Sequence, residues 1–359
     1  MRFAVSVASG TVGLQLLLET TKRQRAVRGA FEVLVPTLTF IATANAVIHA
    51  GGRPVFVDCE RERMNVGSTQ FESFLALHYV RSGEHWISKQ SGLPLLAIMP
   101  AHIMGWCAEM NSIREFCRRV ELPLLEDAAE VLGSFDLEGK HLGHHGLAAS
   151  FSFNGNKILT TGGGGMVVSN DEGFARRAKH LSTTAKTDGL RFVHDEVGYN
   201  FRLVNLLAAL GYSQLQKLPQ RLERKAQIAG LYVQALETVR GVRVHRENHC
   251  RSNNWLVNLV FDEPAHREAA LAALLGADIQ ARPLWTPNHL QPAYREFDQP
   301  TRDFPHATWM WERCLSVPSS PQLADDDILR ICEIIGAAVR VGAKSAAGEP
   351  KPQMCDLGG

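Results

Sequence analysis

The sequence predicts an α/β protein whose larger domain is built on a mostly parallel sheet. Across the first half of the chain, short apolar runs rich in β-branched residues alternate with helical patterns, as in a sheet covered by helices. These runs are almost continuously apolar, which is typical of strands buried on both faces. The 359 residues, of which 45% are apolar, are sufficient for two domains.

The expected elements of the larger domain follow one another along the chain. Strands are predicted at 32–36, 54–58, 93–99 and 122–126, and helices at 39–50 and 112–119. Ligands of such sheets bind beyond the carboxyl ends of the strands. This rule directs attention to Asp58, His102 and Asp127, each of which lies at or just past a strand end.

The second part of the chain begins with a long helix after Pro219, predicted from apolar residues at helical spacing. This helix is either a connector that faces the core or a surface that docks on a partner. Strands at 255–261 and 278–282 and helices at 265–275 and 326–341 follow. We therefore expect a large domain over 1–239, a small α+β domain over 240–343 and a disordered tail over 344–359.

Charge and cysteine content exclude several classes of protein. The net charge is +1, without long runs of either sign, which argues against a nucleic-acid or lipid-surface partner. Apolar stretches are shorter than the ~18–20 residues of a membrane span, and the first residues lack the pattern of a secretory signal. The seven cysteines are scattered without a CxxC pair. This pattern argues against a disulfide framework or a zinc knuckle, and we expect reduced thiols in a cytoplasmic protein without a metal site.

The strongest chemical signal is the segment from Phe151 to Gly165, where an apolar strand leads to Lys157 and then to four consecutive glycines. The order differs from a P-loop, in which glycines precede the lysine. Glycines allow a flat ligand to approach the backbone, and a fixed lysine can form a Schiff base with a carbonyl cofactor. The alternative is a surface lysine in a glycine-rich hairpin.

Two weaker signals point to the same kind of cofactor. The Glu126-Asp127 pair ends a predicted strand, where an acid can hold the ring nitrogen of pyridoxal phosphate (PLP) or cap the next helix. Ser9-Gly10-Thr11 precedes a helical pattern, where a helix start can bind phosphate or can simply be capped by a side chain. The three signals are specific only together and in this order.

Over residues 3–342 the sequence resembles the DegT/DnrJ/StrS family of PLP-dependent sugar aminotransferases. The resemblance is carried by SGT at 9–11, VPTLTFIATAN at 35–45, GRPVFVD at 52–58, LEDAAE at 125–130, residues 152–165, and GYNFR at 198–202 with Asn205. It implies an aspartate-aminotransferase-like fold, PLP fold type I. The segments at 153–165, 280–285 and 289–294 look most like the LegC/PglE branch.

The resemblance implies a set of roles around PLP. Lys157 would form the Schiff base and move the proton, and Asp127 would hold the pyridinium N–H. The phosphate would be bound by Ser152, Gly10 and Thr11.

Further roles follow from the same resemblance. Phe40 would stack on the ring, and Asn200 would reach the cofactor phosphate of the other subunit in a homodimer. Glu130, where many members have Gln, would contact the phenolic oxygen. His102 would be a structural support or a substrate contact. Three residues of a segment near the sugar nucleotide would bind substrate or be structural: Arg282, Trp285 and His289.

The implied reaction is transamination at C4 of a nucleotide-linked 4-keto-6-deoxy-N-acetylhexosamine, with glutamate as amino donor. Its products would serve bacterial surface-glycan or nonulosonic-acid synthesis. The dehydrating relatives carry His in place of the Schiff-base lysine, whereas position 157 is Lys.

Two departures from the family pattern bear on this interpretation. Family members usually have a helix and a glycine-containing loop before the equivalent of Phe3. The basic segment 19–31 replaces a short turn and is expected to be an exposed loop. An alternative is therefore a catalytically impaired homologue that binds a nucleotide sugar or a partner protein.

Overall fold

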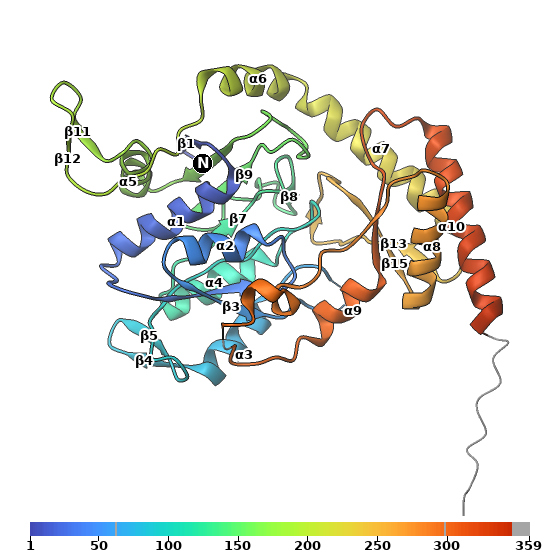
Figure 1. Ribbon diagram of the computed structural model, residues 1–359, viewed down its shortest axis with the longest axis horizontal. Helices are drawn as coiled ribbons and strands as arrows, with labels where there is room; N and C mark the ends of the chain where they lie inside the picture. Colours follow the sequence, from blue (N-terminus) through green and yellow to red (C-terminus); the bar gives the residue numbers. More distant parts are fainter. Residues whose placement is uncertain (62, 298, 347–359) are drawn as a thin grey trace, which may run out of the picture. The chain divides into compact units, whose positions relative to one another are not determined.

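The computed structural model describes residues 1–61, 63–297 and 299–346, with side chains up to Arg340. The chain forms two compact units (Figure 1). Unit 1 contains residues 1–226, 246–256 and 285–311, and unit 2 contains 227–245, 257–284 and the chain from 312 onward. The domain ranges expected from the sequence stay a prediction. In the structure the chain enters unit 2 within a helix, at residue 227, and returns to unit 1 twice, at 246–256 and at 285–311.

Unit 1 is organised by a mixed sheet with mostly parallel strands. A three-stranded parallel sheet, in the order β3-β2-β6, is joined to a four-stranded sheet, β7-β9-β10-β1, by parallel bridges Ile98–Leu124 and Ala101–Asp127. Strand β10 runs antiparallel to both of its neighbours, and β7 runs parallel to β9. The strands are β1 (Phe3–Val7), β2 (Glu32–Pro36), β3 (Arg53–Val57), β6 (Leu95–Ile98), β7 (Leu125–Asp127), β9 (Ala148–Ser152) and β10 (Gly165–Ser169).

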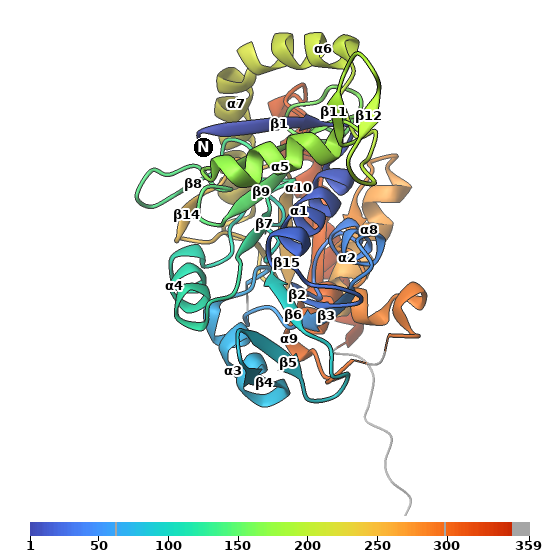
Figure 2. The same ribbon diagram turned by 90° about the vertical axis from the view of Figure 1, so that its left-hand side faces the viewer.

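Helices cover both faces of this sheet (Figure 2). On one face α1 (Gly10–Gln24) contacts α2 (Ala42–His49), α5 (Glu172–Ser182) and strands β9 and β10. On the other, α3 (Ser68–His78) and α4 (Met110–Val120) bury Phe71, Ile113 and Phe116 against Leu34 and Val55. A sheet covered on both faces explains why its strands lack polar alternation.

Smaller elements complete unit 1. Hairpins are formed by β4 (Tyr79–Ser82) with β5 (His85–Ser88), and by β11 (Lys186–Asp188) with β12 (Val193–His194). Strand β14 (Cys250–Arg251) pairs with β8 (Phe135–Asp136), so the returning segment 246–256 is anchored to the unit. The helices α6 (Asn205–Gln216), η1 (Asn288–Leu290) and η2 (Pro292–Tyr294) also belong to unit 1, together with most of α9 (Pro305–Arg313).

Unit 2 is an antiparallel sheet packed with helices. Its strand order is β13-β15-β17-β16, from β13 (Val242–Val244), β15 (Val257–Phe261), β17 (Cys314–Val317) and β16 (Arg282–Pro283). Helix α7 (Leu218–Leu236) enters the unit, and α8 (Pro264–Gly276) packs against α10 (Asp325–Ala346). Tyr232, Phe261 and Ile335 lie in its core. Among the described residues, no helix has both the length and the apolar character required to cross a membrane.

The structure corrects several local expectations. Residues 19–24 continue α1 instead of forming a loop, because Arg23 pairs with Glu19 one turn earlier and with Glu196, and Glu19 is buried. The predicted strand at 278–282 is reduced to β16, and Asp278 has a positive φ of 58°. Helix α2 begins at residue 42, not 39. Helix α10 continues through Ala346, and the rest of the predicted tail lies outside the described residues.

Candidate active site

Lys157 lies in the turn that follows β9, with its amine directed toward buried groups. Its backbone N–H donates to Asn154 O (3.0 Å). The Nζ atom is 3.0 Å from Glu130 Oε1 and 4.0 Å from the centre of the Trp255 ring, and only 11% of the side chain is exposed. A surface lysine in a loose hairpin is therefore the wrong description of this residue.

Asp127 ends β7 as a buried carboxylate. Its Oδ2 accepts a hydrogen bond from Thr43 Oγ1 (2.6 Å), and its Oδ1 accepts one from the Ala129 N–H (3.1 Å). Burial raises the pKa of Asp127, while the hydrogen bond from Thr43 and the nearby charge of Lys157 oppose this change. An acid held in this way can bind a cationic ring N–H.

The start of α1 and the end of β9 together form a place for an anion. Ser9 caps the helix by accepting a hydrogen bond from the Val12 N–H (3.3 Å). The first N–H groups of a helix have no intrahelical acceptor and favour negative charge. A Cβ placed on Gly10 would lie 2.7 Å from Ser152 Cβ, so glycine is what allows the helix start to approach this hydroxyl. Thr11 stands at the same helix end, half-buried.

Aromatic rings border the lysine. Phe40, just before α2, is 49% exposed, and its ring centre is 5.6 Å from that of Trp285. Trp285 in turn lies 6.5 Å from Trp255. A row of aromatic rings that runs from the partly exposed Phe40 to the lysine is suited to a flat conjugated ligand.

Glu130 is the carboxylate closest to the lysine amine. It is 6% exposed, and its Oε2 accepts a hydrogen bond from the Met104 N–H (2.9 Å). Burial raises the pKa of Glu130, and the charge of Lys157 opposes that increase. Its expected contact with a phenolic oxygen stays a prediction.

His102 is placed as a structural support. It is 1% exposed, its Nε2 lies 3.0 Å from Glu126 Oε2, and its Nδ1 accepts a hydrogen bond from the Ala108 N–H (3.2 Å). Burial penalises the charge of Glu126, but hydrogen bonds from His102 and the Gly146 N–H outweigh it and lower the pKa of Glu126. Since both ring nitrogens are engaged, this geometry supports the structural reading of His102 over the substrate contact.

The remaining predicted residues have different environments. The Nδ1 of His289 lies 2.7 Å from Thr37 Oγ1, its ring stacks on Phe304, and burial lowers its pKa to about 4. Asn200 is exposed, between the β11–β12 hairpin and α6. Arg282 belongs to unit 2 and is exposed, so its substrate role stays a prediction.

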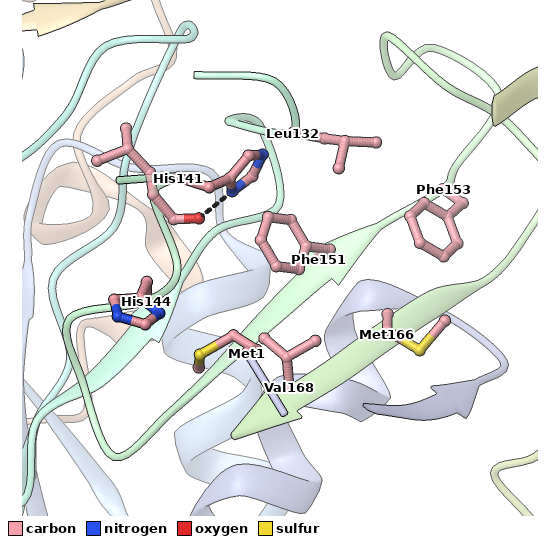
Figure 3. A pocket seen from close by; sticks show the side chains of 9 residues that line it. Met1, Leu132, His141, His144, Phe151, Phe153, Met166 and Val168 are labelled. Carbon is pink, nitrogen blue, oxygen red and sulfur yellow. Dashed lines mark hydrogen bonds between the residues drawn. The ribbon is translucent and has the colours of Figure 1, made fainter. Parts of the chain in front are cut away.

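A separate apolar pocket lies on the other face of β9 and β10 (Figure 3). Phe151, Met166 and Val168 point into it, whereas Ser150 of the same sheet donates to Gly10 O on the α1 side. None of the lining residues is among those predicted to bind PLP. The sheet thus separates this pocket from the anion site.

Two residues of this site were not expected from the sequence. The sequence predicts a helix at Thr43 and a strand at Trp255, and indicates no further role for either residue. Trp255 is fixed at three points: its Nε1–H donates to Asn156 O (2.8 Å), its N–H donates to Asn253 Oδ1 (2.9 Å), and its carbonyl accepts from Lys225 Nζ (2.5 Å). Asn156 and Lys225 are distant from Trp255 in sequence, so local pattern gave no signal for these two contacts.

Comparisons with known proteins agree with this geometry. Residues 1–336 match the DegT/DnrJ/EryC1/StrS aminotransferase family. The chain is 34% identical over 342 residues to the putative pyridoxal phosphate-dependent aminotransferase EpsN of Bacillus subtilis (strain 168), covering 93% of this chain and 83% of EpsN. It is 32% identical over 338 residues to the GDP-perosamine synthase of Vibrio cholerae, covering 93% and 86%.

Solved structures give the same result. The aminotransferase TlmJ from Streptoalloteichus hindustanus superposes with a TM-score of 0.82 at 27% identity, covering 94% of this chain and 86% of TlmJ. The protein belongs to the DegT/DnrJ/EryC1/StrS aminotransferase family, and the predicted PLP fold type I is confirmed. It is a sugar aminotransferase of the PLP-dependent class.

Proposed function

We propose that this DegT/DnrJ/EryC1/StrS family member aminates C4 of a nucleotide-linked 4-keto-6-deoxy-N-acetylhexosamine, with glutamate as the amino donor. The observation that supports the transamination is a buried amine, Lys157, in the same site as a buried acid, Asp127, close enough for the charge of Lys157 to oppose the rise in the pKa of Asp127. The sugar class rests on relatives such as the GDP-perosamine synthases, whose name gives a nucleotide-linked sugar. The LegC/PglE branch rests on the segments quoted from the sequence.

The residues present are suited to PLP. When bound, this cofactor supplies an aldehyde that captures amines and a ring that accepts electrons. Asp127 would hold the ring N–H, because its carboxylate is buried and already supported by the Thr43 hydroxyl. The start of α1 at Gly10 and the Ser152 hydroxyl would hold the phosphate.

Lys157 would act as the base that moves the proton during transfer. Its amine has a carboxylate on one side, from Glu130, and an aromatic face on the other, from Trp255. These two contacts fix the position of Nζ without enclosing it completely. Trp285 and Phe40 would exclude water from the ring face, which limits side reactions.

A homodimer with shared active sites is part of the proposal. Helix α6 has no buried residue within the single chain. Large apolar side chains on it and on the preceding segment are exposed: Leu190, Phe192, Val193, Val197, Val204, Leu206, Leu210, Tyr212 and Leu215. Extended apolar surface of this kind marks a protein interface. Asn200 lies within this stretch, where it would reach the cofactor phosphate of the second subunit.

We place the reaction in the cytoplasm, which agrees with the scattered cysteines: the six within the described residues are buried and free.

The test is incubation with PLP, glutamate and a panel of UDP- and GDP-linked 4-keto-6-deoxy sugars, followed by mass spectrometry. We expect a product in which the ketone has become an amine. Lys157→Ala is expected to abolish both turnover and the visible absorption of the lysine-linked cofactor. Lys140→Ala, which changes an exposed lysine paired with Glu138, is the control and should keep both.

Two results would contradict the proposal. Full transaminase activity in Lys157→Ala would refute the role of the lysine. A wild-type protein that stays colourless after PLP is added, yet binds nucleotide sugar, would favour the catalytically impaired homologue.

A further inference from the structure

A second cluster of chemically active side chains lies in unit 1, apart from the lysine site. Cys107 is in the loop between β6 and α4, and His249 and Cys250 are in the segment that returns to the unit. Both cysteines are buried, with 3% and 7% exposure. The two sulfurs and one ring nitrogen of His249 lie within 4.8 Å of one another.

The imidazole of this cluster is oriented by oxygen atoms. His249 Nε2 is 2.9 Å from both Glu247 Oε2 and the carbonyl oxygen of Cys107, so Nε2 carries a proton. The other nitrogen, Nδ1, is buried and has no hydrogen-bond partner among the described residues. A histidine whose N–H is held by a backbone carbonyl beside a carboxylate, with the other nitrogen left free, is the arrangement of metal-ligating histidines.

The thiols are also prepared for a cation. The two sulfurs lie within 4.8 Å of each other and of one ring nitrogen of His249. Two sulfurs and one imidazole nitrogen are the ligands that Zn²⁺ prefers in tetrahedral sites.

We propose that Cys107, Cys250 and His249 form a zinc site in which Glu247 orients the histidine and a water molecule completes the coordination. Binding transfers no electrons: the ion displaces one proton from each thiol. The imidazole binds the ion through its unprotonated nitrogen. This inference does not depend on the proposed reaction.

The position of the site gives it a structural role. The segment 246–256 also carries Asn253, whose Nδ2 donates to Glu130 O (2.9 Å) and whose N–H donates to Ser134 Oγ (2.9 Å). Ser134 Oγ in turn donates to Gly105 O (2.9 Å), in the same loop as Cys107. A bound zinc ion would therefore stabilise the position of segment 246–256, which includes Trp255, against the part of unit 1 that contains Glu130.

The other possible metal cluster is less suited. In the group of His180, Asp195 and Glu196, the carboxylate of Glu196 already pairs with Arg23 and Arg177. Two guanidinium groups beside this carboxylate compete with a cation.

The test is the zinc content of the full-length protein, purified in reducing buffer and equilibrated with zinc salt before gel filtration. We expect about one zinc ion per chain, falling at least tenfold in Cys107→Ser and Cys250→Ser. Cys117→Ser is the matched control, because Cys117 is a buried cysteine of α4 outside the cluster. Its zinc content should equal that of the wild type.

A second measurement uses only the wild-type protein, so it does not depend on how the variants fold. Cobalt added to the metal-free protein should produce the strong near-ultraviolet absorption of thiolate-bound cobalt. Zinc should also slow alkylation of Cys107 and Cys250, read by mass spectrometry, while leaving alkylation of Cys117 unchanged. Absence of zinc from the fully reduced wild type would overturn the proposal, and so would a zinc content in both serine variants equal to that of the wild type. So would a Cys107–Cys250 disulfide that persists in place of metal uptake.

Discussion

The hydrogen bond between Thr43 and Asp127 makes a quantitative prediction about cofactor binding. Thr43→Val keeps the shape of the side chain and removes the hydroxyl that lies 2.6 Å from Asp127 Oδ2. Thr43 is fully buried and Asp127 is 6% exposed, so solvent does not readily replace the lost donor. A hydrogen bond to a charged group contributes about 1.5–3 kcal/mol, which corresponds to about 10–100-fold in an equilibrium constant.

The sign of the effect follows from the ionisation of Asp127. Burial raises the pKa of this carboxyl, and the Thr43 hydroxyl opposes the increase. The variant therefore has a still higher pKa, so protonation of Asp127 begins at higher pH. The proposed ring N–H contact requires the carboxylate, so cofactor affinity should fall as pH decreases through this pKa. In Thr43→Val the fall should occur at higher pH, with about 10–100-fold weaker binding there.

The assay is fluorescence titration with pyridoxamine phosphate across a pH series, because this form of the cofactor does not link covalently to Lys157. The matched control is Thr20→Val, since the Thr20 hydroxyl is also fully buried but has no hydrogen-bond partner among the described residues. Its titration curves should match those of the wild type. If Thr43→Val and Thr20→Val gave the same affinity at every pH, the role assigned to this hydrogen bond would be wrong.

Three further substitutions test other parts of the structure. Gly10→Ala places a Cβ 2.7 Å from Ser152 Cβ, a strain of about 1–3 kcal/mol that should weaken PLP binding roughly 5–100-fold in a spectroscopic titration; unchanged affinity would exclude this phosphate site. Leu206→Asp on the exposed face of α6 should yield monomers in light scattering and lose activity, whereas Leu77→Asp on α3, also exposed, should remain dimeric. Asp58→Ala removes the acceptor of two N–H groups at the start of α9 and should lower Tm by about 2–8 °C in calorimetry; an unchanged Tm would count against this capping.

The local sequence pattern correctly predicted those strands and helices whose positions depend on residues close together in the chain. Continuous apolar runs gave the strand at 32–36 with the observed bounds and the strand at 54–58 within one residue. The pattern failed where distant partners decide the conformation. The expected helix at 39–50 starts three residues later, because Asn288 Nδ2 donates to the carbonyls of Thr37 and Thr39 and holds these residues outside the helix.

The basic segment 19–31 shows the same limitation of sequence-based prediction, because its charged side chains have partners outside the segment. Clustered positive side chains suggested an exposed loop, but the guanidinium of Arg23 is neutralised by Glu19 and Glu196, and Lys22 lies over the Phe31 ring. Glu196 is far away in sequence and Phe31 lies beyond the end of the helix. The helix could be predicted only with knowledge of these contacts, which depend on the completed fold.

The two adjacent acids at the end of β7 show that the direction of a side chain has to be known before a role at a strand end is assigned to it. Successive side chains of a strand point to opposite faces, so Glu126 and Asp127 cannot share a site. Glu126 accepts hydrogen bonds from His102 and from the Gly143 and Gly146 N–H groups, and so holds loops in place. Asp127 faces the lysine. Replacing either acid removes a buried charge, but only the loss of Asp127 should act directly on the cofactor, whereas the loss of Glu126 should act first on folding.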